Sequence, residues 1–458
     1  MARHMAMALT LPVVLGTLTL GAPAVAAVPP SPPSSPSSAR PVTEPGPAAV
    51  AALDRAAHPL RTVEPGGDTR DLRPLGEMTG DARVVGLGEA THSTHDFFAL
   101  KDRVFRHLVT ERGFRTFALE ASWSTGLRLD DYVVHGRGDP RRIMRDEFQR
   151  DYLWWNNTDY LKLVEWMRRY NVRHPDDPVR FLGDDIAWTG PEVYDEVMEY
   201  VAGHHPALSA RVAELYRGLR PAVPTGTYIE EYLGKPYVER REAADRTGEA
   251  LRLLERQGPD GDRAGYDRAV QQATAIDRTA RQYAFDFDDP AQTAAAMRYR
   301  DEAMADNVLW WQRRTGTKVL LSAHNAHVSY ETMDPRHYPR MQGAFLRDRL
   351  GADYVSVGLT FDRGSFNATG QDGAIHRWTL GPAGPGGNEH ILDRVRHRDY
   401  LVDLRTVGPP AAAWLREARP TRSIGTDYPD GPYDIALARA HDVLIHLHEV
   451  EAARLRDR

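Results

Sequence analysis

A glutamate and two histidines lie close together near residue 90, in a pattern that can do acid–base chemistry. They stand as Glu89, His92 and His95 in the segment GLGEATHSTH, directly after the β-branched pair Val84-Val85. An imidazole titrates near neutral pH, and a neighbouring carboxylate fixes its tautomer and stabilises its protonated form. We therefore expect His92 and Glu89 to activate a water molecule. The structural alternative is that these groups only satisfy local hydrogen bonds of the loop.

Three further strand-like runs end in carboxylates or histidines. Glu120 follows residues 116–119, Asp184 and Asp185 follow residues 179–182, and His324 and His327 follow residues 319–321. The carboxyl ends of parallel strands share one edge of a sheet, so groups far apart in the sequence can meet there. We expect all of these side chains to converge with Glu89 and His92. As a structural alternative, Glu120 caps a loop formed by Ala121 to Ser124.

The pair His324 and His327 also allows a metal site. The spacing H-x-x-H with nearby carboxylates can hold a divalent ion, here through nitrogen and oxygen ligands only. The ligands of such an ion would be His324, His327, Glu89 and Glu120. We interpret a later histidine group near the C-terminus as structural or surface: His441, His446 and His448.

Several other kinds of catalytic site have no support in the sequence. The chain has no cysteine, which excludes disulfides, thiolate metal sites, a cysteine nucleophile and a lipid-modified cysteine. It has no G-x-S-x-G, S-x-x-K or H-E-x-x-H motif, so neither a serine acyl-enzyme nor a zincin is indicated. Water activated directly by a histidine is the simpler mechanism.

The elements that must position these residues alternate between strand and helix. Apolar residues recur at spacings of three and four in segments such as 97–108 and 161–167, which is typical of amphipathic helices. Between the helical segments lie short β-branched runs at 84–85, 116–119, 179–182, 319–321, 354–357, 400–402 and 443–445. This alternation predicts an α/β fold with a central, mostly parallel sheet flanked by helices.

One long segment contains almost no strand-like sequence. Residues 191–311 consist of polar helical patterns, including 241–257 and 266–283, which are separated by a Gly-Pro-Asp-Gly turn. We expect a mainly helical insert or cap that covers a site on the sheet edge. Residues 221–236 are rich in Gly, Pro, Thr and Tyr and could form a mobile loop within it.

The N-terminal residues carry features of export. Residues 1–26 combine an early arginine, a short apolar run and an Ala-Val-Ala pattern, which predicts a secretory signal peptide. Residues 27–48 are rich in Pro, Ser and Ala and predict a disordered linker before a domain at 49–458. We expect a secreted, extracellular protein without membrane insertion after cleavage. The net charge of −6, without a basic block, makes nucleic acid an unexpected partner.

At the level of motifs, the chain resembles the erythromycin esterase family. The family's motifs stand here, in the family's order, as Gly88–His92 (GEATH), Ala118–Glu120 (ALE), Gly183–Asp185 (GDD), Arg300–Asn307 (RDEAMADN) and His324–His327 (HNAH). The resemblance covers roughly residues 60–450, and on it the chain is identified as a member of this family.

The resemblance implies a hydrolase that opens the lactone ester of a macrolide, an activity linked to antibiotic resistance. It implies that His92 is the base, that Glu89 and Glu120 orient it or bind water, and that His324 and His327 bind or polarise the substrate carbonyl. We assign Lys101, Asp184 and Asp185 to substrate binding. The implied partner is a small-molecule ester; no cofactor is expected, although a divalent metal is allowed.

Two other functions remain open at this point. The same His- and Glu-rich pocket could bind a metal or a tetrapyrrole-like ligand without turnover, or could belong to a metal-dependent hydrolase of another substrate. A plainer alternative is a secreted binding protein whose polar strand ends only satisfy loops. Export also departs from the family, because resistance esterases are expected to act inside the cell.

Overall fold

The computed structural model describes residues 46–431 and 433–457. The predicted signal peptide at 1–26 and most of the predicted linker therefore lie outside the described residues. The first helix, α1 (Pro47–Ala56), begins inside the segment that the sequence predicted as linker. Its proline at the first turn explains this start, because proline lacks only an N–H that would be unpaired there.

The centre of the molecule is a nine-stranded sheet with the order β1-β8-β11-β6-β2-β5-β3-β4, and β7 pairs with β6. Along this order from β11 to β4, consecutive strands are parallel to one another. The antiparallel pairs are β1 with β8, β8 with β11, and β7 with β6. The predicted α/β class with a mostly parallel sheet is confirmed.

The strands have the following bounds: β1 (His58–Pro59), β2 (Val84–Leu87), β3 (Phe114–Ser122), β4 (Arg180–Asp185), β5 (Lys318–Ser322), β6 (Tyr354–Thr369), β7 (Ile375–Leu380), β8 (Tyr400–Asp403) and β11 (Val443–Val450). A separate two-stranded sheet pairs β9 (Arg419–Thr421) with β10 (Tyr433–Ile435).

Both faces of the sheet are buried, which is why its strands are almost continuously apolar. In β2, Val85 and Leu87 belong to one core, and Val84 belongs to the core on the opposite face. The first core includes side chains of α3 (His95–Arg112) and α6 (Thr158–Arg173). The second includes side chains of α12 (Pro290–Thr315) and α14 (Gln342–Leu350).

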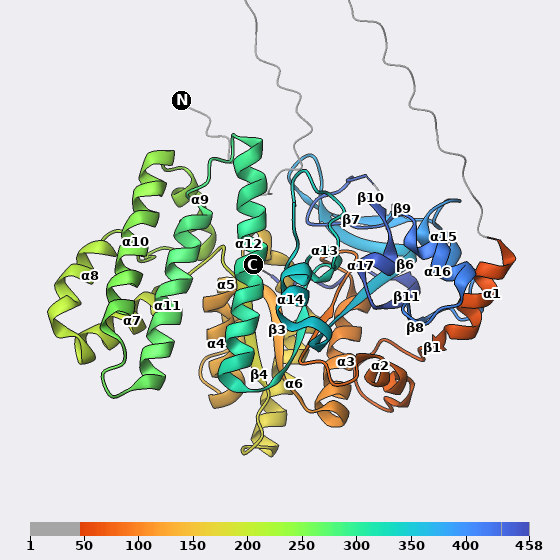
Figure 1. Ribbon diagram of the computed structural model, residues 1–458, viewed down its shortest axis with the longest axis horizontal. Helices are drawn as coiled ribbons and strands as arrows, with labels where there is room; N and C mark the ends of the chain where they lie inside the picture. The colour runs from red at the N-terminus through yellow and green to blue at the C-terminus, as the bar shows by residue number, and fades with distance from the viewer. Residues whose placement is uncertain (1–45, 432, 458) are drawn as a thin grey trace, which may run out of the picture.

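The chain between β4 and β5 is built from helices and the turns that join them. These helices are α7 (Pro191–His204), α8 (Ser209–Leu215), α9 (Thr225–Leu233), α10 (Tyr237–Gln257), α11 (Arg263–Gln282) and α12. In Figure 1, α8, α10 and α11 lie at one side of the molecule, and α1, α15 and α16 lie at the opposite side. A role for this segment as a cap stays a prediction.

The expectation of a mobile loop at residues 221–236 was wrong, because α9 forms within it. Pro224 precedes this helix, and Ile229 and Tyr232, three residues apart, are both buried against the rest of the segment. Burial of this apolar side outweighs the poor helix propensity of the glycine and threonines at its start.

The remaining α-helices are α2 (Arg73–Thr79), α4 (Trp123–His135), α5 (Pro140–Glu147), α13 (Asn325–Val328), α15 (Asn388–Leu392), α16 (Pro409–Arg416) and α17 (Leu437–Ala440). Short 3₁₀ turns occupy Arg70–Leu72, Arg150–Trp155, Pro206–Leu208 and Gly351–Asp353. Among the described residues, each helix is too short or too polar to span a bilayer.

Candidate functional site

The polar groups singled out in the sequence lie at the carboxyl ends of four neighbouring parallel strands. Glu89 and His92 follow β2, Glu120 and Asp185 lie at the ends of β3 and β4, and His324 follows β5. The loop expected after Glu120 does not form, because β3 continues to Ser122 and α4 begins at Trp123. A register shift between Leu119 and Ser122 interrupts the pairing of β3 with β4 at this point.

His92 is held by Glu89 in one orientation. The Nδ1 atom of His92 lies 3.0 Å from Glu89 Oε1, and the Glu89 side chain is fully buried. The other Glu89 oxygen accepts from Lys101 Nζ, which also donates to the carbonyl of Ala323 at 3.2 Å. Because an ionised carboxylate can only accept, Nδ1 of His92 carries the proton and Nε2 keeps a free lone pair. His92 therefore has the tautomer that a general base needs.

His324 has the opposite arrangement. Its ring centroid lies 4.9 Å from that of His92. Its Nδ1 accepts from the backbone N–H of Ala326 at the start of α13, so the proton of the neutral ring is on Nε2. Burial and the neighbouring His92 hold the pKa of His324 well below its usual value, which keeps the ring neutral. Its Nε2–H has no hydrogen-bond partner among the described residues and is available to a ligand.

Glu120 joins the second histidine of the HNAH motif to this centre. Its Oε2 accepts from the backbone N–H of His324 at 3.0 Å, and its Oε1 lies 3.1 Å from both His327 Nε2 and Arg300 Nη2. Burial raises the pKa of Glu120, but the positive charges of His327 and Arg300 outweigh burial and hold that pKa well below its usual range. Glu120 is therefore a carboxylate that positions its neighbours and has no oxygen free to take a proton.

His327 is charged in this arrangement. Its Nδ1 lies 2.8 Å from Asp301 Oδ1, which also accepts from the backbone N–H of Gln342. Burial lowers the pKa of His327, but Asp301 and Glu120 outweigh burial and raise it to about 10. The His327 imidazolium donates to both carboxylates. Its Nε2 also lies 3.3 Å from Arg300 Nη1, and the negative charges of the carboxylates balance these two neighbouring cations.

Asp185 anchors Arg300 from the neighbouring strand. Arg300 donates to Asp185 through Nη2 at 2.6 Å and Nε at 3.0 Å, a bidentate pair. Asp185 also accepts from the hydroxyl of Tyr152 at 2.8 Å. The Arg300 guanidinium is thereby fixed beside Glu120 and His327 and adds positive charge to this part of the site.

Glu89 and three other residues considered from the sequence do not line the pocket. Lys101 is fully buried behind Glu89. Asp184 is also fully buried and accepts from Gln342 Nε2 at 2.6 Å; burial raises its pKa well above the usual range. It neighbours Asp185 along β4, so the two side chains point to opposite faces. His95 lies outside the pocket and contacts Asp159 and Glu64.

The remaining groups open into a pocket with a volume of about 500 Å³. Its polar lining includes His92, Glu120, Asp185, Arg300, His324 and His327, together with Gln282, Gln371, Asp427 and Asp430. Apolar and aromatic side chains form much of the rest: Trp155, Ile229, Tyr283, Phe287, Met333, Tyr338, Met341, Pro429 and Tyr433. A pocket of this size, with polar groups among apolar walls, suits a small-molecule ligand.

A metal ion bound by His324, His327, Glu89 and Glu120 does not fit the observed contacts. Both oxygens of Glu89, both oxygens of Glu120 and both nitrogens of His327 have protein partners. Of the four residues only His324 keeps a ring nitrogen without a partner, and that nitrogen carries a proton. Lys101, Arg300 and the charged His327 already supply positive charge beside Glu89 and Glu120, so a further cation there would be repelled.

The sequence interpretation did not include Arg300, Asp301, Tyr152 or Trp155 in the site. Arg300 and Asp301 lie on α12, between predicted strands, so strand ends could not reveal them. The RDEAMADN motif was visible, and its first two residues are those that contact the site. Tyr152 and Trp155 lie in a 3₁₀ turn for which the sequence offered no signal; Trp155 donates to the carbonyl of Glu120 at 2.7 Å.

Most of the chain is similar in sequence to a known family of esterases. The family model described as erythromycin esterase matches residues 109–450, a range that begins after the Glu89–His92 turn. Erythromycin esterase type II of Escherichia coli is 27% identical over 327 residues, which cover 66% of this chain and 74% of that protein.

Two solved structures extend the likeness to the N-terminal part of the body. A Bacillus cereus protein is 28% identical with a TM-score of 0.81, and the match covers 90% of this chain and 99% of that one. A mutant of the erythromycin esterase EreC in its open conformation has a TM-score of 0.69 at 18% identity, over 86% of this chain and 98% of that one. At 18% identity, the likeness to EreC shows a shared fold and no more.

Proposed function

Because the chain belongs to the erythromycin esterase family and is an ester-hydrolysing enzyme, we propose that it opens the ester of a bulky, largely apolar small molecule such as a macrolide lactone. In this proposal His92 is the general base, oriented by Glu89, and His324 donates to the substrate carbonyl.

The observation that carries this proposal is the different partner of each Nδ1, which is Glu89 for His92 and the backbone N–H of Ala326 for His324. These partners favour a lone pair on Nε2 of His92 and a proton on Nε2 of His324, in rings whose centroids are 4.9 Å apart. A base and a hydrogen-bond donor at this separation can hold an attacking water and a carbonyl oxygen side by side. Both residues line the same pocket.

The reaction follows from these roles. Water attacks the carbonyl carbon while its proton passes to Nε2 of His92, and the carbonyl oxygen becomes an oxyanion that accepts from Nε2–H of His324. The C–O bond to the alcohol then breaks, and the His92 imidazolium returns the proton to the departing oxygen. The products are a carboxylic acid and an alcohol, so the net change is the addition of one water. Glu89 stabilises the transient imidazolium.

The size and lining of the pocket support a bulky substrate. Its aromatic and aliphatic walls can bury an apolar ring system, and the cations Arg300 and His327 favour negative charge that develops beside them. The E. coli relative is named for an activity on erythromycin. A macrolide lactone is therefore the first substrate class to test.

Export is a further part of the proposal. The pattern at residues 1–26 supports a cleaved signal peptide, so the enzyme would act on esters outside the cell. An exported esterase could destroy an antibiotic before it enters the cell. The test is N-terminal sequencing of protein recovered from the culture medium: a start near Ala27 agrees with this location, and retention of an uncleaved chain inside the cell contradicts it.

The experiment for the activity is mass spectrometry of macrolides and smaller esters incubated with the purified protein. We expect a macrolide to gain the mass of one water. His92→Ala should lower kcat by about 10²–10⁴-fold, because general-base catalysis contributes a factor of that order. A chelator should leave the rate unchanged, since the site residues hold protons and not a metal.

The matched control is His376→Ala. His376 is an exposed histidine on β7 that pairs with Asp372 and does not line the pocket, so this variant should keep full activity. Full activity in His92→Ala would remove His92 from the mechanism. Hydrolysis of small esters alone would move the substrate class away from macrolides.

A further inference from the structure

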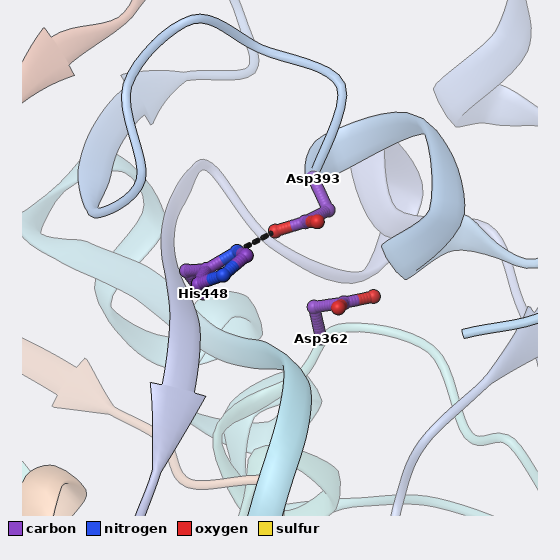
Figure 2. Close-up of side chains that lie close together, drawn as sticks. All are labelled: Asp362, Asp393 and His448. Atoms are coloured by element: carbon purple, nitrogen blue, oxygen red, sulfur yellow. Dashed lines mark hydrogen bonds and ion pairs between the residues drawn. The ribbon is translucent and has the colours of Figure 1, made fainter. Parts of the chain in front are cut away.

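A second group of ligating side chains lies outside the pocket. It consists of Asp362 on β6, Asp393 directly after α15, and His448 on β11 (Figure 2). One ligand atom from each of the three lies within 4.8 Å of the others. Figure 2 shows the Asp393 carboxylate and the His448 ring facing one another, with the Asp362 carboxylate beside them. None of the three lines the pocket.

The register of the sheet brings a fourth residue to this group. Phe361 and Arg363 pair with Leu447 and Glu449, so Asp362 and His448 lie at matching positions on adjacent strands. His446 precedes His448 by two residues on β11 and therefore points to the same face. A strand face with two histidines spaced in this way can present both rings to one ligand.

The surroundings of His446 point to a ligand. Its side chain is fully buried, and its Nδ1 lies 3.0 Å from the hydroxyl of Thr360. Its Nε2 has no hydrogen-bond partner among the described residues and lies 3.6 Å from Asp393 Oδ1. A buried ring nitrogen without a hydrogen-bond partner costs free energy. A cation between this nitrogen and the Asp393 carboxylate would bind both atoms and remove that cost.

One distance in this group already matches the spacing of tetrahedral metal ligands. Zinc binds histidine nitrogen and carboxylate oxygen at about 2.0–2.2 Å, which separates tetrahedral ligand atoms by roughly 3.3–3.6 Å. The distance from His446 Nε2 to Asp393 Oδ1 is 3.6 Å. His448 Nδ1 lies 2.6 Å from the same oxygen through a hydrogen bond that a metal would replace, releasing the proton to solvent.

Hydrogen bonds from neighbouring residues orient these side chains in the way that is typical of metal ligands. The Nδ1–H of His446 can donate to Thr360, which leaves Nε2 deprotonated for a metal. Arg363 donates to Asp362 Oδ2 at 2.9 Å and lies 3.5 Å from Asp393 Oδ2, so it orients both carboxylates from the outer side. The side chains of Asp393 and His448 are each 18% exposed, which gives an ion access from solvent.

We propose that His446, His448, Asp393 and Asp362 form a binding site for a divalent transition metal ion, with zinc as the ion to test. Two imidazoles and two carboxylates are a ligand set that suits zinc, and here they come from β11, β6 and the residue after α15. The ion would tie β11 and β6 to the segment after α15. This site is independent of the proposed hydrolysis.

The test is a titration of the chelator-treated, dialysed protein with zinc chloride, followed by calorimetry and by elemental analysis of the bound metal. We expect about one zinc per chain and a rise of a few degrees in Tm, because an ion that binds only the folded state stabilises it. Cobalt in place of zinc should give the strong visible absorbance of a tetrahedral site. His448→Ala and, separately, Asp393→Asn should lose at least about 10-fold in zinc affinity.

Two control variants locate the ion. His376→Ala removes an exposed histidine–aspartate pair of the kind that binds zinc adventitiously, and it should leave the stoichiometry unchanged. His92→Ala, in the pocket, should also retain zinc. If the unaltered protein binds no zinc, the proposed site is wrong. It is also wrong if the folded variants His448→Ala and Asp393→Asn bind zinc as tightly as the unaltered protein does. Zinc lost only in His92→Ala or His376→Ala overturns it too.

Discussion

At the residue scale, the two imidazoles of the site differ in where each carries its proton. His92 is fixed by a carboxylate, and His324 is fixed by a backbone N–H. The same side chain type is thereby a base in one position and a donor in the other. The difference comes entirely from the partner of Nδ1.

This assignment predicts the effect of removing the donor. His324→Ala should lower kcat by about 10²–10³-fold with little change in KM, because the lost hydrogen bond forms fully only when charge develops on the carbonyl oxygen. Steady-state kinetics on the ester identified by mass spectrometry measures the effect. His324→Asn can still cap α13 and should show the same loss, which separates catalysis from stability. An unchanged kcat in both variants contradicts the donor role.

At the element scale, close contact between α4 and β4 helps to place the end of β4. Gly126 of α4 packs on the backbone of Gly183, two residues before Asp185. A Cβ at Gly126 would lie 1.9 Å from the backbone nitrogen of Gly183. The helix can therefore lie this close to the strand only without a side chain at that position.

Gly126→Ala should destabilise the protein by about 3 kcal/mol or more, because a clash with backbone atoms cannot be relieved by a rotamer change. Thermal or urea unfolding measures the loss. The control is Gly203→Ala in α7, where a Cβ would meet nothing within 4 Å. There we expect a gain of about 0.5–1 kcal/mol from the better helix propensity of alanine. Equal stability of the two variants would contradict this account of the packing.

His95 links the start of α3 to α6 and predicts a pH effect. Hydrogen bonds with Asp159 and Glu64 outweigh burial and raise the pKa of His95 to about 9, from 6.5. Because the folded pKa lies above the unfolded one, the stabilisation is complete below pH 6.5 and disappears as the pH rises through 9.

We expect His95→Gln to lower the free energy of unfolding by about 1 kcal/mol at low pH, since Glu64 is largely exposed and solvent weakens its part of the interaction. The difference between the two proteins should shrink toward zero above the folded pKa. Urea unfolding at about pH 6, 8 and 10 measures it. A difference that grows with pH would have the wrong sign for a charged His95.

At the scale of the whole molecule, several separate parts of the chain close around the pocket. The strand ends and α12 supply much of the polar centre, and the segment between β4 and β5 supplies Ile229, Tyr283 and Phe287. The segment between α13 and α14 supplies Met333 and Tyr338, and the segment before α17 supplies Pro429 and Tyr433. Most of the polar groups that could do chemistry therefore come from the sheet. The apolar walls that would select a substrate come from segments that only the complete fold brings to the pocket.

Ile229→Ala should raise KM for a bulky ester about 5-fold and leave small esters unaffected, because it removes about 1 kcal/mol of apolar contact from one wall. Comparison of KM for a macrolide and for a short-chain ester tests this. Val238→Ala is the control, since Val238 is exposed on α10 of the same helical segment. Equal changes in KM for both esters would indicate that Ile229 does not contact the bulky part of the substrate.

The sequence by itself determined the class of the fold and most of the polar centre. Alternating strand and helix patterns require a parallel sheet, and parallel strands place their carboxyl ends on one edge, so Glu89, His92, Glu120 and His324 had to come near one another. The motifs that indicated the family follow the same pattern in part: four of the five lie at this edge, and the fifth lies on α12.

The tertiary structure decided which atoms face the ligand. Asp184 and Asp185 are neighbours in the sequence, yet the pleat sends one behind the sheet and the other to Arg300. Lys101, which the sequence assigned to substrate binding, is buried behind Glu89. Arg300 and Tyr152 enter the site from a helix and a turn whose approach depends on packing. Periodicity along the chain predicts elements, whereas the direction of a side chain and the site of its proton depend on partners that are distant in sequence.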